Sequence, residues 1–321
     1  MTRASSGSPA ISICVCTFRR PLGLSRLLHS LRGLDPHTPS REVIVIDNDA
    51  ERSAEALVRR AIQDGLDVHY EVEPVRNIAL ARNRAVLCAQ GDWLAFIDDD
   101  EEADPLWLLE LWRSVQSSDI DAAFGVVIRR FEPTTPAWIR SVYPAQQRLP
   151  GGALRWQDTG TGNAFVRRAT ILSLNGLFNP YYGETGGEDA ELFSRMAIRG
   201  CTLVGVPGAI VYESLPASRL TIRYLLRWWF AAGVIVANVD NAANRLSADG
   251  ASSDPSLLLR RVRLTGVHVI QGGLLIPWSR ERALKHLMKA AFESGTILGG
   301  RFGLRVRRPR RVSDVPLDSR L

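Results

Sequence analysis

The chain has few cysteines and no paired metal-binding cysteines. Its 321 residues include Cys14, Cys16, Cys88 and Cys201, with no CxxC pair, and its five histidines are scattered. Zinc fingers and zinc ribbons need Cys or His ligands in pairs at short spacing. We therefore expect neither a disulfide framework nor a structural zinc site, and we interpret the cysteines as buried, reduced thiols of a cytosolic protein.

A secretory signal and a membrane-spanning segment are also lacking. The first ten residues, MTRASSGSPA, contain no apolar core region and predict a disordered tail over residues 1–10. The longest apolar runs, Trp228 to Val239 and Leu264 to Trp278, are shorter than the ~20 residues of a spanning helix and contain polar residues. These features predict a cytoplasmic protein.

Several familiar catalytic motifs are missing. No GxGxxG follows the first apolar strand, and no GxxxxGK[ST] occurs anywhere, which disfavours an ordinary dinucleotide-binding fold and a phosphate-binding loop. HExxH and GxSxG are absent too, which argues against a zinc protease and an α/β-hydrolase. The chemistry must therefore be sought in other residues.

Charge of one sign is concentrated near the end of the chain. The formal net charge is +6, and much of the excess lies in the run RFGLRVRRPRR between Arg301 and Arg311. This run has no interleaved aromatic residues, and the chain has no recognised nucleic-acid motif, so we do not expect nucleic acid as a partner. An anionic membrane surface is the favoured partner of this basic tail, residues 301–321.

Apolar segments of strand and helix period alternate along the first two thirds of the chain. This alternation predicts βαβ units and an α/β fold with a mostly parallel, Rossmann-like sheet. Ligands of such sheets bind at the carboxyl ends of the strands. The expected strands include Ile11–Cys16, Glu42–Ile46, Asp67–Val72, Trp93–Ile97 and a pair at Thr202–Val206 and Ala209–Tyr212.

The character of the sequence changes near Ser218. Long segments rich in Arg, Trp and small residues follow and predict mostly helical structure. We expect a catalytic domain over residues 11–217 and a helical C-terminal region over residues 218–300. Trp228, Trp229 and Trp278 of this region either pack against the catalytic domain or lie against a membrane.

Five acids follow directly after the strand that ends at Ile97. In the run Asp98 to Glu102, Asp98 and Asp100 share a side if strand geometry continues, with Asp99 on the other face. Carboxylates are the ligands that Mg²⁺ and Mn²⁺ prefer, so the run predicts a divalent-metal site. The alternative is an acidic turn that caps a helix beginning near Pro105.

A second acidic pair and an arginine complete the candidate set. Glu188 and Asp189 follow two glycines at a predicted helix start, where a carboxylate either acts as a general base or caps the helix. Arg82 lies on the helix before the acidic strand, and a guanidinium suits a diphosphate. At least one of Arg76, Arg82 and Arg84 is expected to be an ordinary surface arginine.

Taken together, these stretches resemble the family 2 inverting glycosyltransferases of GT-A fold, particularly bacterial exopolysaccharide enzymes of the succinoglycan glucosyltransferase type. The resemblance covers roughly Ile11 to Glu213. It is carried by ISICVCTFRRP, EVIVIDNDA, NIALARNRAV, GDWLAFIDDDEEADPLWL, TGTGNAFVRR and GGEDAELFSRMAIRG, in the family's order and spacing.

The resemblance implies transfer of a hexose from a nucleotide sugar, with UDP the expected nucleotide, to an acceptor hydroxyl with inversion. It implies a cytoplasmic enzyme, peripheral on the inner face of the membrane, in exopolysaccharide or other cell-surface glycan synthesis on a lipid-linked acceptor. A divalent metal, Mn²⁺ or Mg²⁺, is the implied cofactor. The implied roles are Thr17 and Arg19 beside the nucleotide, Asp47 on the base, Arg82 on the diphosphate, Asp98 on ribose and metal, Asp100 on metal, and Asp189 as base with Glu188 beside it.

The sequence departs from the family pattern in one place. Many relatives have a histidine after the strand near Ala209–Tyr212, and here the chain reads Tyr212-Glu213, which makes Glu213 the candidate third metal ligand. The chain keeps Arg227-Trp228 but lacks the glutamine of the QxxRW motif of processive synthases, so we expect single-sugar addition. Two alternatives remain: a nucleotidyltransferase, and a sugar-nucleotide or membrane-binding module without turnover.

Overall fold

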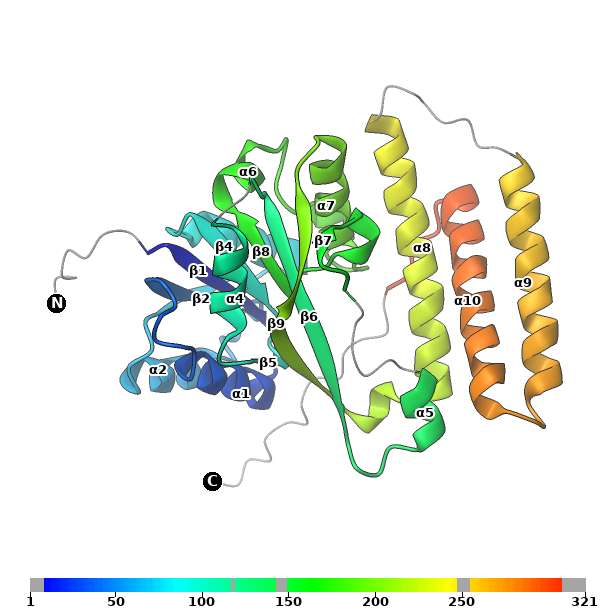
Figure 1. The fold of residues 1–321 in the computed structure, drawn as a ribbon, viewed down its shortest axis with the longest axis horizontal. Coiled ribbons are helices and arrows are strands. Elements are labelled where there is room, and N and C mark those ends of the chain that lie inside the picture. The colour runs from blue at the N-terminus through cyan, green and yellow to red at the C-terminus, as the bar shows by residue number, and fades with distance from the viewer. Residues whose placement is uncertain (1–8, 117–118, 143–148, 247–254, 308–321) are drawn as a thin grey trace.

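The computed structural model describes residues 9–116, 119–142, 149–246 and 255–307 (Figure 1). Most of the predicted N-terminal tail and residues 308–321 of the predicted basic tail lie outside these ranges. Within the described ranges, no helix combines the length and the apolar character that crossing a membrane requires.

The first hundred residues form the expected alternation of strands and helices. Apolar residues at three- and four-residue spacing place one face of each helix against the sheet. The helix bounds agree with this pattern, as in α1, which buries Leu24, Leu27, Leu28 and Leu31. The elements are β1 (Ile11–Thr17), α1 (Pro21–Arg32), β2 (Arg41–Asp47), α2 (Glu55–Gln63), β3 (Val68–Val72), α3 (Ile78–Cys88), β4 (Trp93–Ile97), β5 (Glu101–Ala103) and α4 (Trp107–Ser114).

The second hundred residues complete the sheet. They contribute β8, which lies between β4 and β6 and is antiparallel to both, and β9, which pairs in parallel with β6. The sheet order is β3-β2-β1-β4-β8-β6-β9-β5, and β7 pairs with β9. These elements are β6 (Ala122–Phe131), α5 (Ala137–Val142), β7 (Gly152–Ala153), η1 (Trp156–Asp158), β8 (Asn163–Arg167), α6 (Arg168–Ser173), η2 (Pro180–Tyr182), α7 (Glu188–Ile198) and β9 (Leu203–Leu215).

Helices cover both faces of this sheet, and each face has its own core. One core joins α1, α2 and α4 to the sheet through Leu27, Val58 and Trp107, and the other joins α3, α6 and α7 through Ala85, Ile171 and Phe193. Strand side chains alternate between faces, so each buried strand contributes to both cores. Strands β1, β2, β3 and β4 are mutually parallel, so their carboxyl ends lie at one edge of the sheet.

The expected strand pair at residues 202–212 is a single strand instead. β9 runs through Pro207 and Gly208 without reversing, and its pairing with β6 shifts register so that Val206 faces Gly125 but Ile210 faces Val126. The extra residues form a bulge rather than a turn. The prediction of two strands was wrong because Pro-Gly signals a hairpin turn and a bulge equally well.

Asn163 of β8 holds this bulge in place. Its side chain is buried and donates to the carbonyl oxygens of Val126 at 3.2 Å and Ala209 at 3.0 Å, and it accepts from the indole nitrogen of Trp107 at 2.8 Å. One side chain therefore satisfies three buried groups from β6, β9 and α4.

Replacing this side chain is expected to destabilise the fold. In Asn163→Ala, the indole N–H and two carbonyls lose their partner, and we expect the free energy of unfolding to fall by about 3 kcal/mol. Urea unfolding followed by tryptophan fluorescence measures the change. In the control Asn175→Ala, at an exposed site, the change should stay below about 0.5 kcal/mol. A loss below about 1 kcal/mol in Asn163→Ala would contradict this account.

The C-terminal region is a bundle of three helices beside the sheet domain (Figure 1). Ile235 and Val239 of the first helix pack with Tyr182, next to the start of α7. β9 ends at Leu215 and the bundle begins at Ile222, and the bundle also contacts the part of the chain that forms the sheet. After η3 (Ala217–Arg219), the bundle consists of α8 (Ile222–Leu246), α9 (Pro255–Leu275) and α10 (Arg280–Phe302).

Candidate active site

A cavity of about 520 Å³ lies at the edge of the sheet where β1 and β4 end. It is closed by the start of α7, by α3 and by β9, which are far apart in sequence. Among the described residues, those that line it are Cys16, Phe18, Arg20, Ile78, Arg82, Asp98, Asp99, Glu101, Val127, Arg129, Gly160, Thr161, Gly162, Glu188, Asp189 and Glu213. The two acidic groups of the sequence, 90 residues apart, thus share one cavity.

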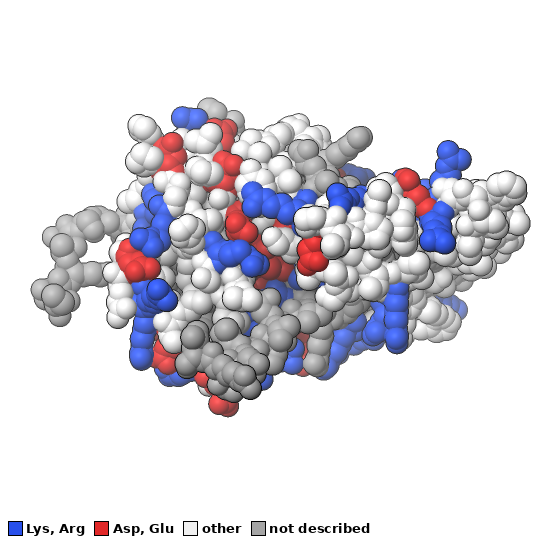
Figure 2. All heavy atoms as spheres, turned by 90° about the horizontal axis from the view of Figure 1, so that it is seen from below, with Lys and Arg blue, Asp and Glu red and all other residues white. Residues whose placement is uncertain are grey.

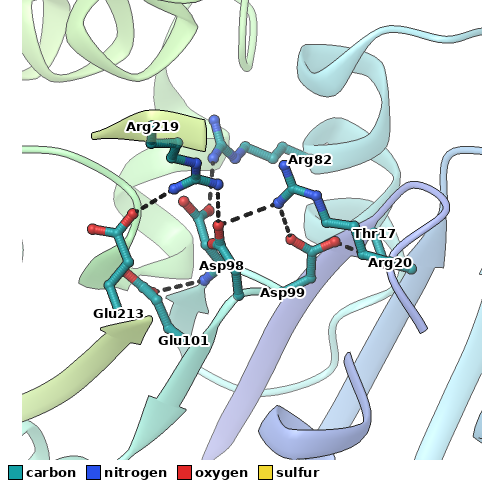
Figure 3. Close-up of polar contacts among 9 residues, drawn as sticks. Thr17, Arg20, Arg82, Asp98, Asp99, Glu101, Glu213 and Arg219 are labelled. Atoms are coloured by element: carbon teal, nitrogen blue, oxygen red, sulfur yellow. Dashed lines mark hydrogen bonds and ion pairs between the residues drawn. The ribbon is translucent and has the colours of Figure 1, made fainter. Parts of the chain in front are cut away.

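Arg82 joins these two acidic groups directly, and Figure 3 shows its contact with Asp98. Its Nη2 donates to Oδ1 of Asp98 at 3.3 Å, and its Nη1 donates to Oε1 of Glu188. Burial alone lowers the pKa of Arg82, but attraction by Glu188 and Asp98 outweighs burial and raises it. Arg82 therefore stays charged inside the cavity.

The acidic run forms a turn, because β4 ends at Ile97. The strand alternation expected for Asp98 and Asp100 does not continue into it. Asp98 and Asp99 both line the cavity, and Asp99 accepts from Oγ1 of Thr17 at 2.9 Å and from Nη1 of Arg20 at 2.7 Å. Burial raises the pKa of Asp99 to about 6, against the opposing effect of Arg20. The expectation that Asp99 turns away from the site was wrong.

Asp100 points toward Arg219, at the junction of β9 and the helical bundle. Nη2 of Arg219 lies 2.7 Å from Oδ2 of Asp100, and its Nη1 lies 2.9 Å from Oε1 of Glu213 (Figure 3). Asp100, Arg219 and Arg20 line a second cavity of about 350 Å³. Glu213 lines the first cavity, so the ion pairs of Arg219 with Asp100 and Glu213 connect the linings of the two cavities.

Glu213 of β9 lies opposite Glu101 of β5 in the sheet. Oε2 of Glu101 accepts from the backbone N–H of Asp98 at 2.9 Å, which fixes the turn. Burial raises the pKa of Glu101, and the nearby charges of Asp98 and Glu213 raise it further. Arg129, whose Nε is 3.3 Å from Oε2 of Glu213, compensates part of this acidic charge.

The carboxylate side chains that line the cavity are suitable ligands for a divalent cation. Among the described side chains that line it, six are carboxylic acids and three are arginines, so acidic charge is in excess. Figure 2 shows acidic surface gathered in a hollow near the middle of one face, beside basic side chains. In their present arrangement, no three Asp, Glu, His or Cys side chains in the described ranges converge on one point, and arginines contact the carboxylates instead. The carboxylates are ligands of the type that a hard cation prefers. A bound cation would replace guanidinium groups as the positive partner of these carboxylates.

Glu188 and Asp189 begin α7, and Gly187 before them allows this placement. Gly187 has φ +99°, and a Cβ atom there would lie 2.3 Å from Cγ2 of Ile235 in α8. Only glycine meets both conditions. Asp189 is half-buried, with Oδ1 2.8 Å from the N–H of Ala190 and Oδ2 3.5 Å from the N–H of Thr161.

Three other residues expected at the site, Thr17, Arg19 and Asp47, do not line the cavity. Thr17 is buried and donates to Asp99, while Arg19 is half exposed and pairs with Asp49 at 2.7 Å. Oδ2 of Asp47 accepts from the N–H of Ala54 at 2.7 Å and from the hydroxyl of Tyr70 at 2.9 Å. Phe18 and Arg20, neighbours of the predicted residues, line the cavity in their place.

The residues that sequence reasoning missed are mainly arginines. Arg20, Arg129 and Arg219 neutralise the acidic groups, and each comes from a different element. Arg20 directly follows the predicted Arg19 at the end of β1, so strand-end position could have identified it. No local pattern marks Arg129 or Arg219, because their partners lie in other strands and turns.

Cys16 lines the cavity and carries a free thiol. Burial raises the pKa of Cys16 to about 12, although Arg82 opposes this shift. The protonated thiol is therefore favoured at neutral pH, which makes Cys16 a poor nucleophile.

Comparison with known proteins identifies the family. The sequence profile of "Glycosyl transferase family 2" matches residues 12–172. The chain is 38% identical over 226 residues to the succinoglycan biosynthesis protein ExoM of Rhizobium meliloti (strain 1021), covering 70% of this chain and 72% of that protein. It is 32% identical over 251 residues to the hyaluronan synthase of Pasteurella multocida, covering 65% of this chain and 25% of that protein.

Solved structures share the fold at low sequence identity. The mannosyltransferase PcManGT from Pyrobaculum calidifontis, solved with GDP-Man and Mn²⁺, superposes with a TM-score of 0.59 at 14% identity, covering 92% of this chain and 88% of that one. TarS 1-349 of S. aureus, solved with UDP, gives 0.51 at 14% identity, with 90% of each chain covered. The expected GT-A fold is confirmed, and the protein belongs to glycosyl transferase family 2.

Proposed function

We propose that this enzyme transfers one hexose from a nucleotide-sugar donor, a UDP-sugar, to an acceptor hydroxyl with inversion, in the synthesis of an exopolysaccharide or other cell-surface glycan. The relative named for succinoglycan biosynthesis supports the glycan class. The fold relatives solved with GDP-Man and with UDP support a nucleotide-sugar donor. The acceptor is lipid-linked and is presented at the cytoplasmic face of the membrane.

The shared cavity is the observation that carries this proposal. It brings Asp98 at the end of β4 and Asp189 at the start of α7 to one space, with Arg82 between their elements. The remaining nucleotide contacts would come from Thr17, Arg19 and Asp47. Oδ1 of Asp47 is buried without a hydrogen-bond partner among the described residues, and the N–H group of a base would satisfy it.

Asp189 is the proposed general base. It would accept the proton of the acceptor hydroxyl as that oxygen attacks the anomeric carbon from the face opposite the diphosphate. The carbon–oxygen bond to the diphosphate then breaks, so configuration inverts in a single displacement. Arg82 would hold the leaving diphosphate by charge-assisted hydrogen bonds, and Glu188 positions Arg82.

Asp98, Asp100 and Glu213 would hold the divalent metal, Mn²⁺ or Mg²⁺. When bound, such a cation neutralises the negative charge that grows on the departing diphosphate. Asp100 and Glu213 already face one cation, the guanidinium of Arg219, which keeps their carboxylates close together.

A donor screen tests the proposed function. Calorimetry of the full chain with UDP-, GDP- and TDP-sugars, with Mn²⁺ and with excess EDTA, should give binding heat for a UDP-sugar that EDTA removes. Incubation with that donor and Mn²⁺ should then release UDP. Release of pyrophosphate from a nucleoside triphosphate would favour the nucleotidyltransferase alternative, and donor binding without turnover would favour the non-catalytic one.

A further inference from the structure

The outward surface of α9 carries large apolar side chains in contact with solvent. Leu259 is 72% exposed, Ile270 63% and Leu274 69%, and Trp278 just beyond the helix is 85% exposed. The helical repeat places the first three on one side of α9. Several exposed large side chains on one surface, rather than scattered singly, mark an interaction site.

The opposite side of α9, which packs on α10, is the more polar one. His268 contacts His286 of α10 across this interface, with 3.2 Å between their Nδ1 atoms. Gly272 lies against Leu287 of α10, whereas a Cβ atom added at Gly273, the next residue, would meet nothing within 4 Å. The helix therefore presents its apolar side to the outside, the reverse of an ordinary surface helix.

The charge on α9 itself is of one sign. Arg260 and Arg263 are exposed among the apolar residues, and residues 255–280 contain no aspartate or glutamate. A second copy docked face to face would bring arginine against arginine without a compensating acid. An anionic membrane matches both features of this surface. Its acidic headgroups would pair with the guanidinium groups, and its apolar layer would receive the leucine and isoleucine side chains.

α9 is also placed for such an encounter. It is the outermost helix of the bundle, on the far side of α10 and α8 from the sheet (Figure 1), and that end of the molecule is mostly uncharged surface with separate basic groups (Figure 2). Trp278 follows at its end, and tryptophan favours the boundary between headgroups and acyl chains.

We propose that α9 lies flat in the surface of an anionic membrane, with Leu259, Ile270, Leu274 and Trp278 inserted among the lipids and Arg260 and Arg263 at the headgroups. Trp228 and Trp229 are placed differently: they pack against each other, and Trp229 also packs against Phe292 of α10. This docking deepens the proposed function by bringing the enzyme to a lipid-linked acceptor, but lipid binding itself does not depend on sugar transfer.

Vesicle flotation of the full chain tests this proposal without donor or acceptor. Vesicles of phosphatidylcholine with phosphatidylglycerol should carry the protein upward, and pure phosphatidylcholine vesicles should carry much less of it. The triple variant Leu259→Gln, Ile270→Gln, Leu274→Gln should lower the partition coefficient by at least about 30-fold. The matched control Leu22→Gln, Ile62→Gln, Leu87→Gln changes exposed residues of the sheet domain and should stay within about twofold of the wild type.

Further measurements separate the sources of binding. Arg260→Gln with Arg263→Gln should weaken binding to anionic vesicles and reduce its sensitivity to salt. Circular dichroism should show unchanged helix content in all variants, because every changed side chain is exposed. Wild-type binding by the α9 triple variant would overturn the proposal. So would light scattering that shows a lipid-free dimer which the triple variant converts to a monomer, since a second copy would then cover α9.

Discussion

Asp189→Asn should lower kcat for sugar transfer by about 10³-fold while leaving donor affinity nearly unchanged. The amide keeps the size and hydrogen-bonding reach of the side chain but cannot accept the acceptor's proton. Asp189 is half-buried at the start of α7, and among the described residues its hydrogen-bond partners are backbone N–H groups, so the substitution should not unfold the helix. Release of UDP measures kcat, and calorimetry with the UDP-sugar measures donor affinity.

Glu184→Gln is the matched control for this variant. Glu184 lies in the segment that precedes α7, is exposed, pairs with Arg307 and does not line the cavity. It should retain full activity. If Asp189→Asn kept more than a tenth of the wild-type kcat, another group would have to be the base.

Asp100→Asn should weaken Mn²⁺ binding by at least about 100-fold, since even the outer partners of metal ligands contribute 10–100-fold to affinity. The amide oxygen of the new side chain can still accept a hydrogen bond from Arg219, whose side chain is only 5% exposed. The contacts that link position 100 through Arg219 to Glu213 should therefore remain, with one negative charge fewer. Titration of free Mn²⁺ by electron paramagnetic resonance measures the affinity independently of turnover, and transfer activity should fall in parallel.

The control comes from the same acidic run. Glu102 faces Arg26 at 3.6 Å and Arg130 at 3.7 Å and, unlike Asp100, lines neither of the two cavities. Glu102→Gln removes the same amount of charge and should leave Mn²⁺ affinity within about threefold, because an exposed pair is weakly coupled through solvent. Equal losses in both variants would mean that the metal responds to net charge alone, and Asp100 would not be a ligand.

Local sequence patterns were sufficient for most of the elements. The run Trp93–Ile97 is apolar throughout and is β4, and the leucines between Leu24 and Leu31 are the buried side of α1. Such patterns work because a strand or helix must bury its own apolar residues wherever it packs. The pattern failed at residues 203–215, where a bulge held by Asn163 replaces a turn, because the hydrogen bonds that stabilise it come from β6 and β8.

For the site, residue type and strand-end position pointed to Asp98, because parallel strands expose their carboxyl ends at one edge. Arg82 and Asp189 lie on helices, and their proposed roles came from residue type together with the family resemblance. Their meeting in one cavity, and the pairing of Asp100 with Arg219 and of Asp99 with Arg20, required the tertiary structure. The same holds for α9, whose helical character follows from its own residues but whose exposed side depends on how it packs on α10. The physical reason is that hydrophobic periodicity acts within a few residues, whereas an ion pair or a helix contact depends on atoms brought together from distant parts of the chain.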